Sequence, residues 1–200
     1  MSTNPLTRNV TGVYRTASVE HVQAGQDWYA DAYRIAGSIA ERHGVSTDTA
    51  AGIIAALSPL NSWGANVTLA DRFIAAGGLN EGYLGVGLTK AQKILDGAAP
   101  LTVLKSDKVS NFYRCIATAG ITDAVCVDRH AYSIAHASRT VQVPSLTPSR
   151  YAAIAETYRR AARILSRQGV KVSPAQVQAV TWVSWRSRYW SAGAFDLKVS

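Results

Sequence analysis

Apolar residues recur every three or four positions along most of the chain, which is the spacing of one face of an α-helix. The first segment with this spacing covers residues 18–43, where Ser18 can cap the start and Gly44 can end the helix. A second, strongly apolar helix is predicted at 47–57 and a third at 63–76. Residues 77–87 hold too many glycines for a regular element.

The second half of the chain continues the helical pattern. We expect short helices at 88–95 and from Pro100, and a longer one at 106–117 that ends before Gly120. Another helix begins near Asp128, and residues 141–148 form a loop. Thr147-Pro148 and Ser173-Pro174 each place a proline at the first helical position of a final pair of helices. The sequence therefore predicts one all-α domain of about nine helices over residues 1–200.

Composition agrees with one soluble domain, since 48% of the 200 residues are hydrophobic and 17% are charged. The longest apolar run, 50–57, is far shorter than the roughly 18 residues that cross a bilayer, and residues 1–10 lack a signal-peptide core. We therefore expect a cytoplasmic protein. Cys115 and Cys126 are isolated, which predicts two buried thiols in a reducing compartment and no metal or iron–sulfur site.

The net charge of +8 lies entirely in the last third of the chain. Residues 1–138 carry 11 basic and 11 acidic side chains, whereas residues 139–200 carry 10 basic side chains against Glu156 and Asp196. Such asymmetry indicates a polyanionic partner, and nucleic acid is the simplest candidate. The alternative is a solvated basic helix face that only aids solubility.

Asp128 is the strongest candidate for chemistry. It follows the apolar residues 124–127 and precedes a helical pattern, so it falls at about the helix N-cap. Exposed amides and the positive end of the helix dipole favour an ionised carboxylate there. A role as helix cap alone is the alternative interpretation.

Four segments around Asp128 follow the order found in the helix-hairpin-helix DNA glycosylase superfamily, which this chain resembles most clearly over residues 47–137. The turn Leu57-Ser58-Pro59-Leu60-Asn61 resembles the Leu-Ser-x-Gln turn that enters DNA beside a flipped base. Residues 90–94, KAQKI, resemble the helix that usually follows, and residues 104–117 match the hairpin and its second helix. Val127-Asp128-Arg129-His130 matches the Val-Asp-x-His signature, 18 residues after Ser110.

Three departures restrict what the resemblance implies. The hairpin 104–110, LKSDKVS, has none of the glycines that let backbone amides approach a DNA phosphate. Ser110 stands where lyase-active members carry a Schiff-base lysine, although Lys108 is two residues away. The four-cysteine cluster loop of some members is absent. The resemblance therefore implies an enzyme without Schiff-base chemistry and without a cofactor.

By this resemblance, Asp128 would stabilise positive charge at C1′ of an extruded nucleotide or orient the attacking water. His130 is expected to be structural. The partner would be double-stranded DNA. Each of the other candidate residues also has a purely structural interpretation. Ser58 and Asn61 could simply form a turn, Trp63 could pack in the core, residues 176–186 could be a core helix, and the cations could face solvent. The expected base pocket or wedge comprises Ser58, Asn61, Trp63, Gln178 and Trp182, and the expected DNA contacts are Lys105, Lys108, Ser110, Arg129, Arg159, Arg160, Arg163 and Arg186.

Three functions follow from these expectations. The first is monofunctional excision of a modified base. The second is suggested by resemblance to phage-type members similar to the alpha-glutamyl/putrescinyl thymine pyrophosphorylase-like proteins: replacement of a pyrophosphate on 5-hydroxymethyluracil by an amine, in the host cytoplasm. The third is a DNA-binding module in which Asp128 is merely a cap. Neither the target base nor the oligomeric state follows from the sequence.

Overall fold

The computed structural model describes residues 4–189, and every regular element in that part of the chain is an α-helix. The all-α prediction is therefore confirmed. Residues 1–3 and 190–200, which the single-domain prediction includes, lie outside the described residues. The ten helices are α1 (Pro5–Arg15), α2 (Val19–His43), α3 (Thr47–Ala56), α4 (Trp63–Ala75), α5 (Gly85–Leu95), α6 (Pro100–Val103), α7 (Asp107–Ala117), α8 (Arg129–Ala135), α9 (Pro148–Arg167) and α10 (Pro174–Tyr189).

Helix ends fall where the capping residues of the sequence place them. Ser18, Ser46 and Ser62 each accept a hydrogen bond from the backbone N–H three residues further on, which satisfies a donor that the first helical turn leaves free. Thr147 does the same before Pro148. Gly44 ends α2 in the left-handed conformation, with φ of 69°.

Two expectations about the elements were wrong. Helix α1 was not anticipated, because its buried face contains Thr7 and Thr11 beside Val10 and Tyr14 and therefore resembles a polar segment. Helix α5 begins at Gly85, three residues before the predicted start at Leu88. Gly87 fits within that first turn because a Cβ there would lie 2.6 Å from the Tyr83 ring.

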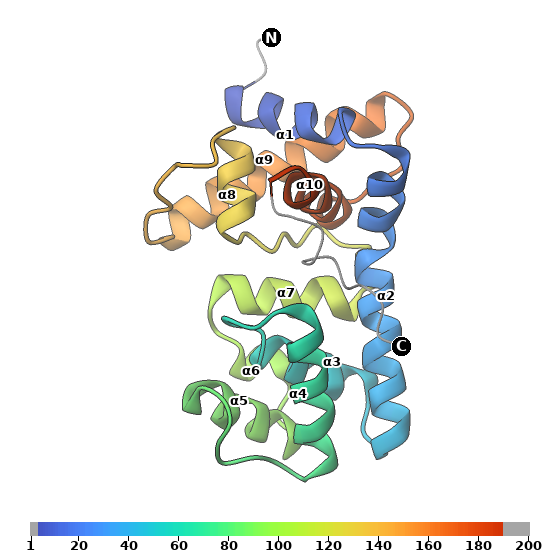
Figure 1. Ribbon diagram of the computed structural model, residues 1–200, viewed down its shortest axis with the longest axis vertical. Helices are drawn as coiled ribbons and strands as arrows, with labels where there is room; N and C mark the ends of the chain where they lie inside the picture. The colour runs from blue at the N-terminus through green and yellow to red at the C-terminus, as the bar shows by residue number, and fades with distance from the viewer. Residues whose placement is uncertain (1–3, 190–200) are drawn as a thin grey trace.

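Two groups of helices pack on opposite sides of a crossing segment (Figure 1). Helices α3–α7 form one group, α1, α8, α9 and α10 form the other, and the long helix α2 runs along both. Each group encloses its own apolar cluster. Residues 118–128 cross between the groups, with Ala124 in the first cluster and Val125 and Val127 in the second.

Helix α10 is shared by both clusters. Ala179 and Val183 belong to the first cluster, whereas Val177 and Val180 belong to the second. Buried residues lie on nearly every side of α10, because the helix is packed against α2, α9, α8 and α1. Within residues 4–189, no helix combines the length and apolarity needed to cross a membrane.

The contact between α2 and α10 should be sensitive to a single methyl group. A Cβ on Gly25 would lie 2.3 Å from the Val180 Cα, so Gly25→Ala must push two backbones apart. We expect it to lower the free energy of unfolding by at least about 1 kcal/mol, measured by urea denaturation. Gly12→Ala is the matched control, because nothing lies within 4 Å of that position, and it should stabilise the protein by about 0.5 kcal/mol. Equal stability of the Gly25 variant and the wild type would contradict the account.

Candidate functional site

The Asp128 carboxylate lies at the N-cap of α8, as predicted. Its Oδ1 accepts a hydrogen bond of 2.7 Å from the Ala131 backbone N–H. The preceding segment is fixed by Tyr151 of α9, whose hydroxyl accepts from the Val127 N–H at 3.0 Å and donates to the Val125 carbonyl at 2.7 Å. The sequence therefore delivers the carboxylate from a buried segment that is held on a neighbouring helix.

The second carboxylate oxygen is bound by a side chain of α10, which packs against α8. Trp182 of α10 donates its Nε1–H to Asp128 Oδ2 at 3.2 Å. The Arg186 guanidinium lies over the Trp182 ring, 4.6 Å from the ring centroid. Each oxygen of an ionised carboxylate has two acceptor positions, so these two donors orient Asp128 and still leave positions for a water molecule or a substrate.

Asp128 is half-buried and lines a cavity of about 470 Å³. The first residues of α7, α8 and α9 meet there, together with the loop before α7. Lys105, Lys108 and Arg129 line the cavity against only two carboxylates, Asp107 and Asp128. The volume suits a small group such as a nucleotide base, and the surplus of cations favours an anionic ligand.

An aromatic cluster joins this region to the turn between α3 and α4. The Trp28 ring lies 4.9 Å from Trp63, 6.0 Å from Phe112 and 6.2 Å from Trp182, measured between ring centroids. Trp28 is buried, whereas the three surrounding rings are half-buried. Trp63 therefore packs in the core with one side exposed, and Trp182 links the cluster directly to Asp128.

His130 is a buried neighbour of the site, in agreement with its expected structural role. Its ring lies 6.4 Å from the Trp182 ring in an edge-on arrangement. Burial lowers the pKa of the imidazole below its ordinary value, while the Asp128 carboxylate opposes that shift. His130 is accordingly neutral at pH 7. Burial also lowers the pKa of the Arg186 guanidinium from its ordinary value, again opposed by Asp128.

Neither cysteine is a candidate nucleophile. Both thiols are free and buried, as the sequence predicts. Burial raises the pKa of the Cys115 thiol to about 12 and that of the Cys126 thiol well above its ordinary value. Within residues 4–189, no three His, Cys, Asp or Glu side chains gather as metal ligands.

Two of the expected DNA-facing residues lie inside the fold and are corrected here. Ser110 is buried, and its hydroxyl donates to the Asp107 carbonyl within α7. Gln178 is buried as well, and its Oε1 accepts from the Tyr29 hydroxyl at 2.8 Å. Gln178, Trp182 and Arg186 follow one another at one-turn intervals on α10, but only Trp182 and Arg186 approach Asp128.

The turn between α3 and α4 carries a residue that the sequence reasoning missed. Ser58 and Asn61 hydrogen-bond to the carbonyls of Ala55 and Leu57, so both brace the turn. The Tyr83 hydroxyl also donates to the Pro59 carbonyl. Leu60 projects from this braced turn with 94% of its surface exposed and a left-handed φ of 64°. A large apolar residue gains nothing from either feature in the isolated protein, which makes Leu60 a candidate functional residue.

The three expected arginines of α9 share one carboxylate. Glu156 lies 2.6 Å from Arg163, 3.2 Å from Arg160 and 3.8 Å from Arg159. One negative charge cannot neutralise three cations, so this part of α9 keeps its positive charge. None of the three lines the Asp128 cavity.

A family model, described as a family of unknown function (DUF7178), matches residues 1–189. The chain belongs to this family. No curated protein and no solved structure matches it. The site of this DUF7178 member therefore has to be interpreted from its own geometry.

For this DUF7178 protein, two substitutions at Asp128 should separate the stability that comes from capping α8 from the stability that comes from the second carboxylate oxygen. Asparagine caps helices as well as aspartate does, but its amide can accept from only one of the two donors, so Asp128→Asn should cost about 1 kcal/mol of unfolding free energy. Asp128→Ala loses both hydrogen bonds and should cost about 2 kcal/mol. Urea denaturation of both variants checks this order. Equal losses would show that the side chain does not cap α8.

Proposed function

We propose that the protein acts on a modified base in double-stranded DNA after the nucleotide has rotated out of the duplex, as a monofunctional glycosylase that uses Asp128. One observation carries the proposal: a carboxylate oriented by two donors stands at the wall of a cation-lined cavity. Anionic groups held in place before the reaction stabilise developing positive charge without reorganising.

Excision breaks the bond between C1′ and the base nitrogen. Positive charge then develops on the sugar, and the Asp128 carboxylate stabilises it. Water attacks C1′ and loses a proton, for which Asp128 is the nearest acceptor in this scheme, and the departing base gains a proton. Water is the nucleophile in this proposal, because position 110 is a buried serine, both thiols are protonated, and Lys105 and Lys108 are assigned to DNA phosphates.

Cations around the cavity suit the DNA backbone. Lys105 and Lys108 lie at the start of α7, and Arg129 lies at the start of α8. All three side chains are exposed, so they can contact phosphates beside an extruded nucleotide while the carboxylate faces its sugar. Arg186 is placed to act through Trp182, because its guanidinium lies on the ring that binds Asp128.

Leu60 supplies an apolar side chain that can fill the gap left in the base stack by an extruded nucleotide. Rotating a nucleotide out of a duplex leaves a gap in the stack, and an apolar side chain can fill it. The turn that bears Leu60 continues into Trp63, which contacts the aromatic cluster that reaches Trp182 and Asp128. The exposed leucine and the carboxylate thus stand on one connected framework.

The same cavity also supports a second candidate, transfer of an amine. Lys105, Lys108 and Arg129 could bind a pyrophosphate carried by the base as readily as a backbone phosphate. In that reaction an amine nitrogen attacks the 5-methylene carbon of the modified uracil, a C–N bond forms, the C–O bond breaks and pyrophosphate leaves. Asp128 would take the proton that the attacking amine loses.

The decisive chemical test uses Asp128→Asn. Wild type and variant are incubated with duplexes that carry ordinary and 5-modified pyrimidines, and the nucleosides are analysed by mass. Loss of the anion should lower product formation at least about 100-fold, while DNA affinity stays within a few-fold because the cations remain. Free base with abasic DNA identifies excision, and a heavier nucleoside with released pyrophosphate identifies transfer. Undiminished product from the variant would remove Asp128 from the mechanism, and binding without product by the wild type would indicate a DNA-binding module.

The role of Leu60 can be tested independently of folding. Leu60→Gly relieves the left-handed backbone but gives up the apolar side chain, so stability should change by less than about 1 kcal/mol. Product formation should fall at least about tenfold, because the extruded state loses about 1.4 kcal/mol or more of stabilisation. Leu84→Ala, which removes another exposed leucine, is the control and should keep full turnover. Equal turnover of the two variants would exclude a role for Leu60 in DNA.

A further inference from the structure

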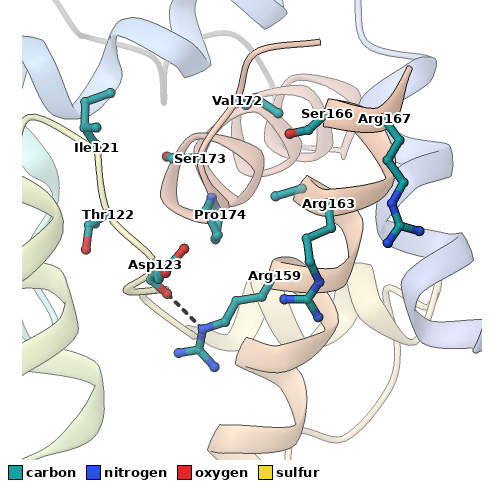
Figure 2. A pocket seen from close by; sticks show the side chains of 11 residues that line it. Ile121, Thr122, Asp123, Arg159, Arg163, Ser166, Arg167, Val172, Ser173 and Pro174 are labelled. Atoms are coloured by element: carbon teal, nitrogen blue, oxygen red, sulfur yellow. Dashed lines mark hydrogen bonds between the residues drawn. The ribbon is translucent and has the colours of Figure 1, made fainter. Parts of the chain in front are cut away.

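A second and larger cavity, of about 640 Å³, lies at the other end of the crossing segment. Residues 121–123 form one side, the second half of α9 forms the opposite side, and Ser173 and Pro174 at the start of α10 lie between them (Figure 2). Arg159, Arg163 and Arg167 stand on successive turns of α9 along this cavity.

The cavity carries more positive than negative charge. Arg159 donates from Nε to the Asp123 backbone carbonyl at 3.0 Å, a contact that leaves the guanidinium charge uncompensated. The Asp123 side chain is the one carboxylate in the lining, set against three guanidinium groups. Glu156 does not line the cavity, and its carboxylate is shared by ion pairs with Arg159, Arg160 and Arg163. The N-terminal end of α10, which is the positive end of its helix dipole, also borders the cavity. The cavity therefore favours an anion.

The Asp128 cavity and this cavity follow one another along α9. Pro148 and Tyr151 line the Asp128 cavity, and Arg159, Ala162 and Ser166 line the second one. Arg163 and Arg167, which are exposed, lie further around the helix than the buried Tyr151. Twelve residues separate Tyr151 from Arg163, or about 18 Å along the axis.

We propose that the arginine cavity, defined by Arg159, Arg163 and Arg167, binds a backbone phosphate of the same DNA molecule whose nucleotide is held at Asp128. The inference rests on the proposed function and adds a second contact to it. In this proposal the duplex axis runs along α9. Each DNA strand carries one phosphate per about 3.4 Å of helix axis, so about 18 Å then corresponds to about five base pairs from the target nucleotide. Guanidinium groups bind phosphate oxygens through paired N–H donors, which suits three arginines in a row.

Exposure favours a strand of DNA over a free oligophosphate. The Arg163 side chain is 54% exposed, and Arg167 is exposed too. Small ligands usually bury 70–90% of their surface in an enclosing pocket, which this open row of arginines does not provide. A polymer that continues beyond the cavity needs no such enclosure, since its other phosphates are bound elsewhere.

The chain offers a close control for the test. Arg160 and Arg163 lie on the same helix, both pair with Glu156, and both side chains are 54% exposed, but only Arg163 lines the cavity. Affinity for a target-containing duplex is measured over a range of salt concentrations for the wild type, Arg163→Gln and Arg160→Gln. Losing one phosphate contact should lower the slope of log affinity against log salt by about 1 for Arg163→Gln. Arg160 lines neither cavity, so in this account it is not the DNA contact that the sequence predicts, and Arg160→Gln should keep the wild-type slope.

A second arm varies the DNA and the anion. On duplexes with only about three base pairs on each side of the target, the difference between Arg163→Gln and the wild type should disappear, because the phosphate five base pairs away is missing. Sodium tripolyphosphate, titrated against the wild type, tests for a free oligophosphate. Saturable tripolyphosphate binding that Arg163→Gln abolishes, combined with an unchanged DNA salt slope in that variant, would assign the cavity to a small ligand and overturn the proposal.

The remaining outcomes separate this inference from the function on which it rests. If the wild type forms product while Arg163→Gln and Arg160→Gln have the same salt slope, only the arginine cavity is excluded. The same exclusion follows if the Arg163→Gln deficit persists on the short duplex. If the wild type neither binds nor converts DNA, both the proposed function and this inference fail.

Discussion

The paired hydrogen bonds to Asp128 hold α8 to α10 and thereby link the two apolar clusters. Ala131, which donates to Oδ1, belongs to the cluster around α8 and α9, whereas Trp182, which donates to Oδ2, packs against the cluster around α3 and α7. The carboxylate can hold this position only while α10 stays between the clusters. The anchoring of residues 125–127 by Tyr151, which lines the cavity, is therefore part of the site, and so is the close approach of Gly25 to Val180, although neither of these two residues lines the cavity.

Local signals made most of the fold predictable. Serine and threonine caps, glycine stops and proline at the first helical position are short-range features, and the helix ends at Ser18, Gly44 and Thr147 follow them. The N-cap position of Asp128 is of the same kind. Helix α1 was missed because threonines can be buried when their hydroxyls bond to the helix itself, as Thr11 does to the Thr7 carbonyl.

The candidate site was less predictable because it depends on packing between distant segments. Gln178 and Trp182 lie one turn apart on α10, so residue type and spacing predict the same site role for both. Tyr29, 149 positions away, binds the first of them in the core, and only the second reaches Asp128. Leu60 was not predicted as a site residue because turns usually expose polar side chains. Neither the φ angle nor the exposure of Leu60 follows from the residue types around it. The arginine cavity likewise requires residues 121–123 to lie beside α9.

These features together describe a molecule that presents a fixed anion among cations. The Lys105, Lys108 and Arg129 charges suit phosphate, and the Asp128 charge suits a sugar that becomes positive. An ordinary helix cap needs neither a tryptophan donor on its second oxygen nor a cavity beside it. The structure thus adds two physical reasons for a role beyond capping, and membership of the DUF7178 family leaves that role to be established by experiment.

The most direct test of the central claim is a structure of the Asp128→Asn variant bound to the duplex whose base the wild type converts. The account predicts one nucleotide outside the stack, with its C1′ within about 4 Å of the side chain at position 128 and Leu60 in the vacated space. A fully stacked duplex, or DNA bound away from the Asp128 cavity, would contradict it.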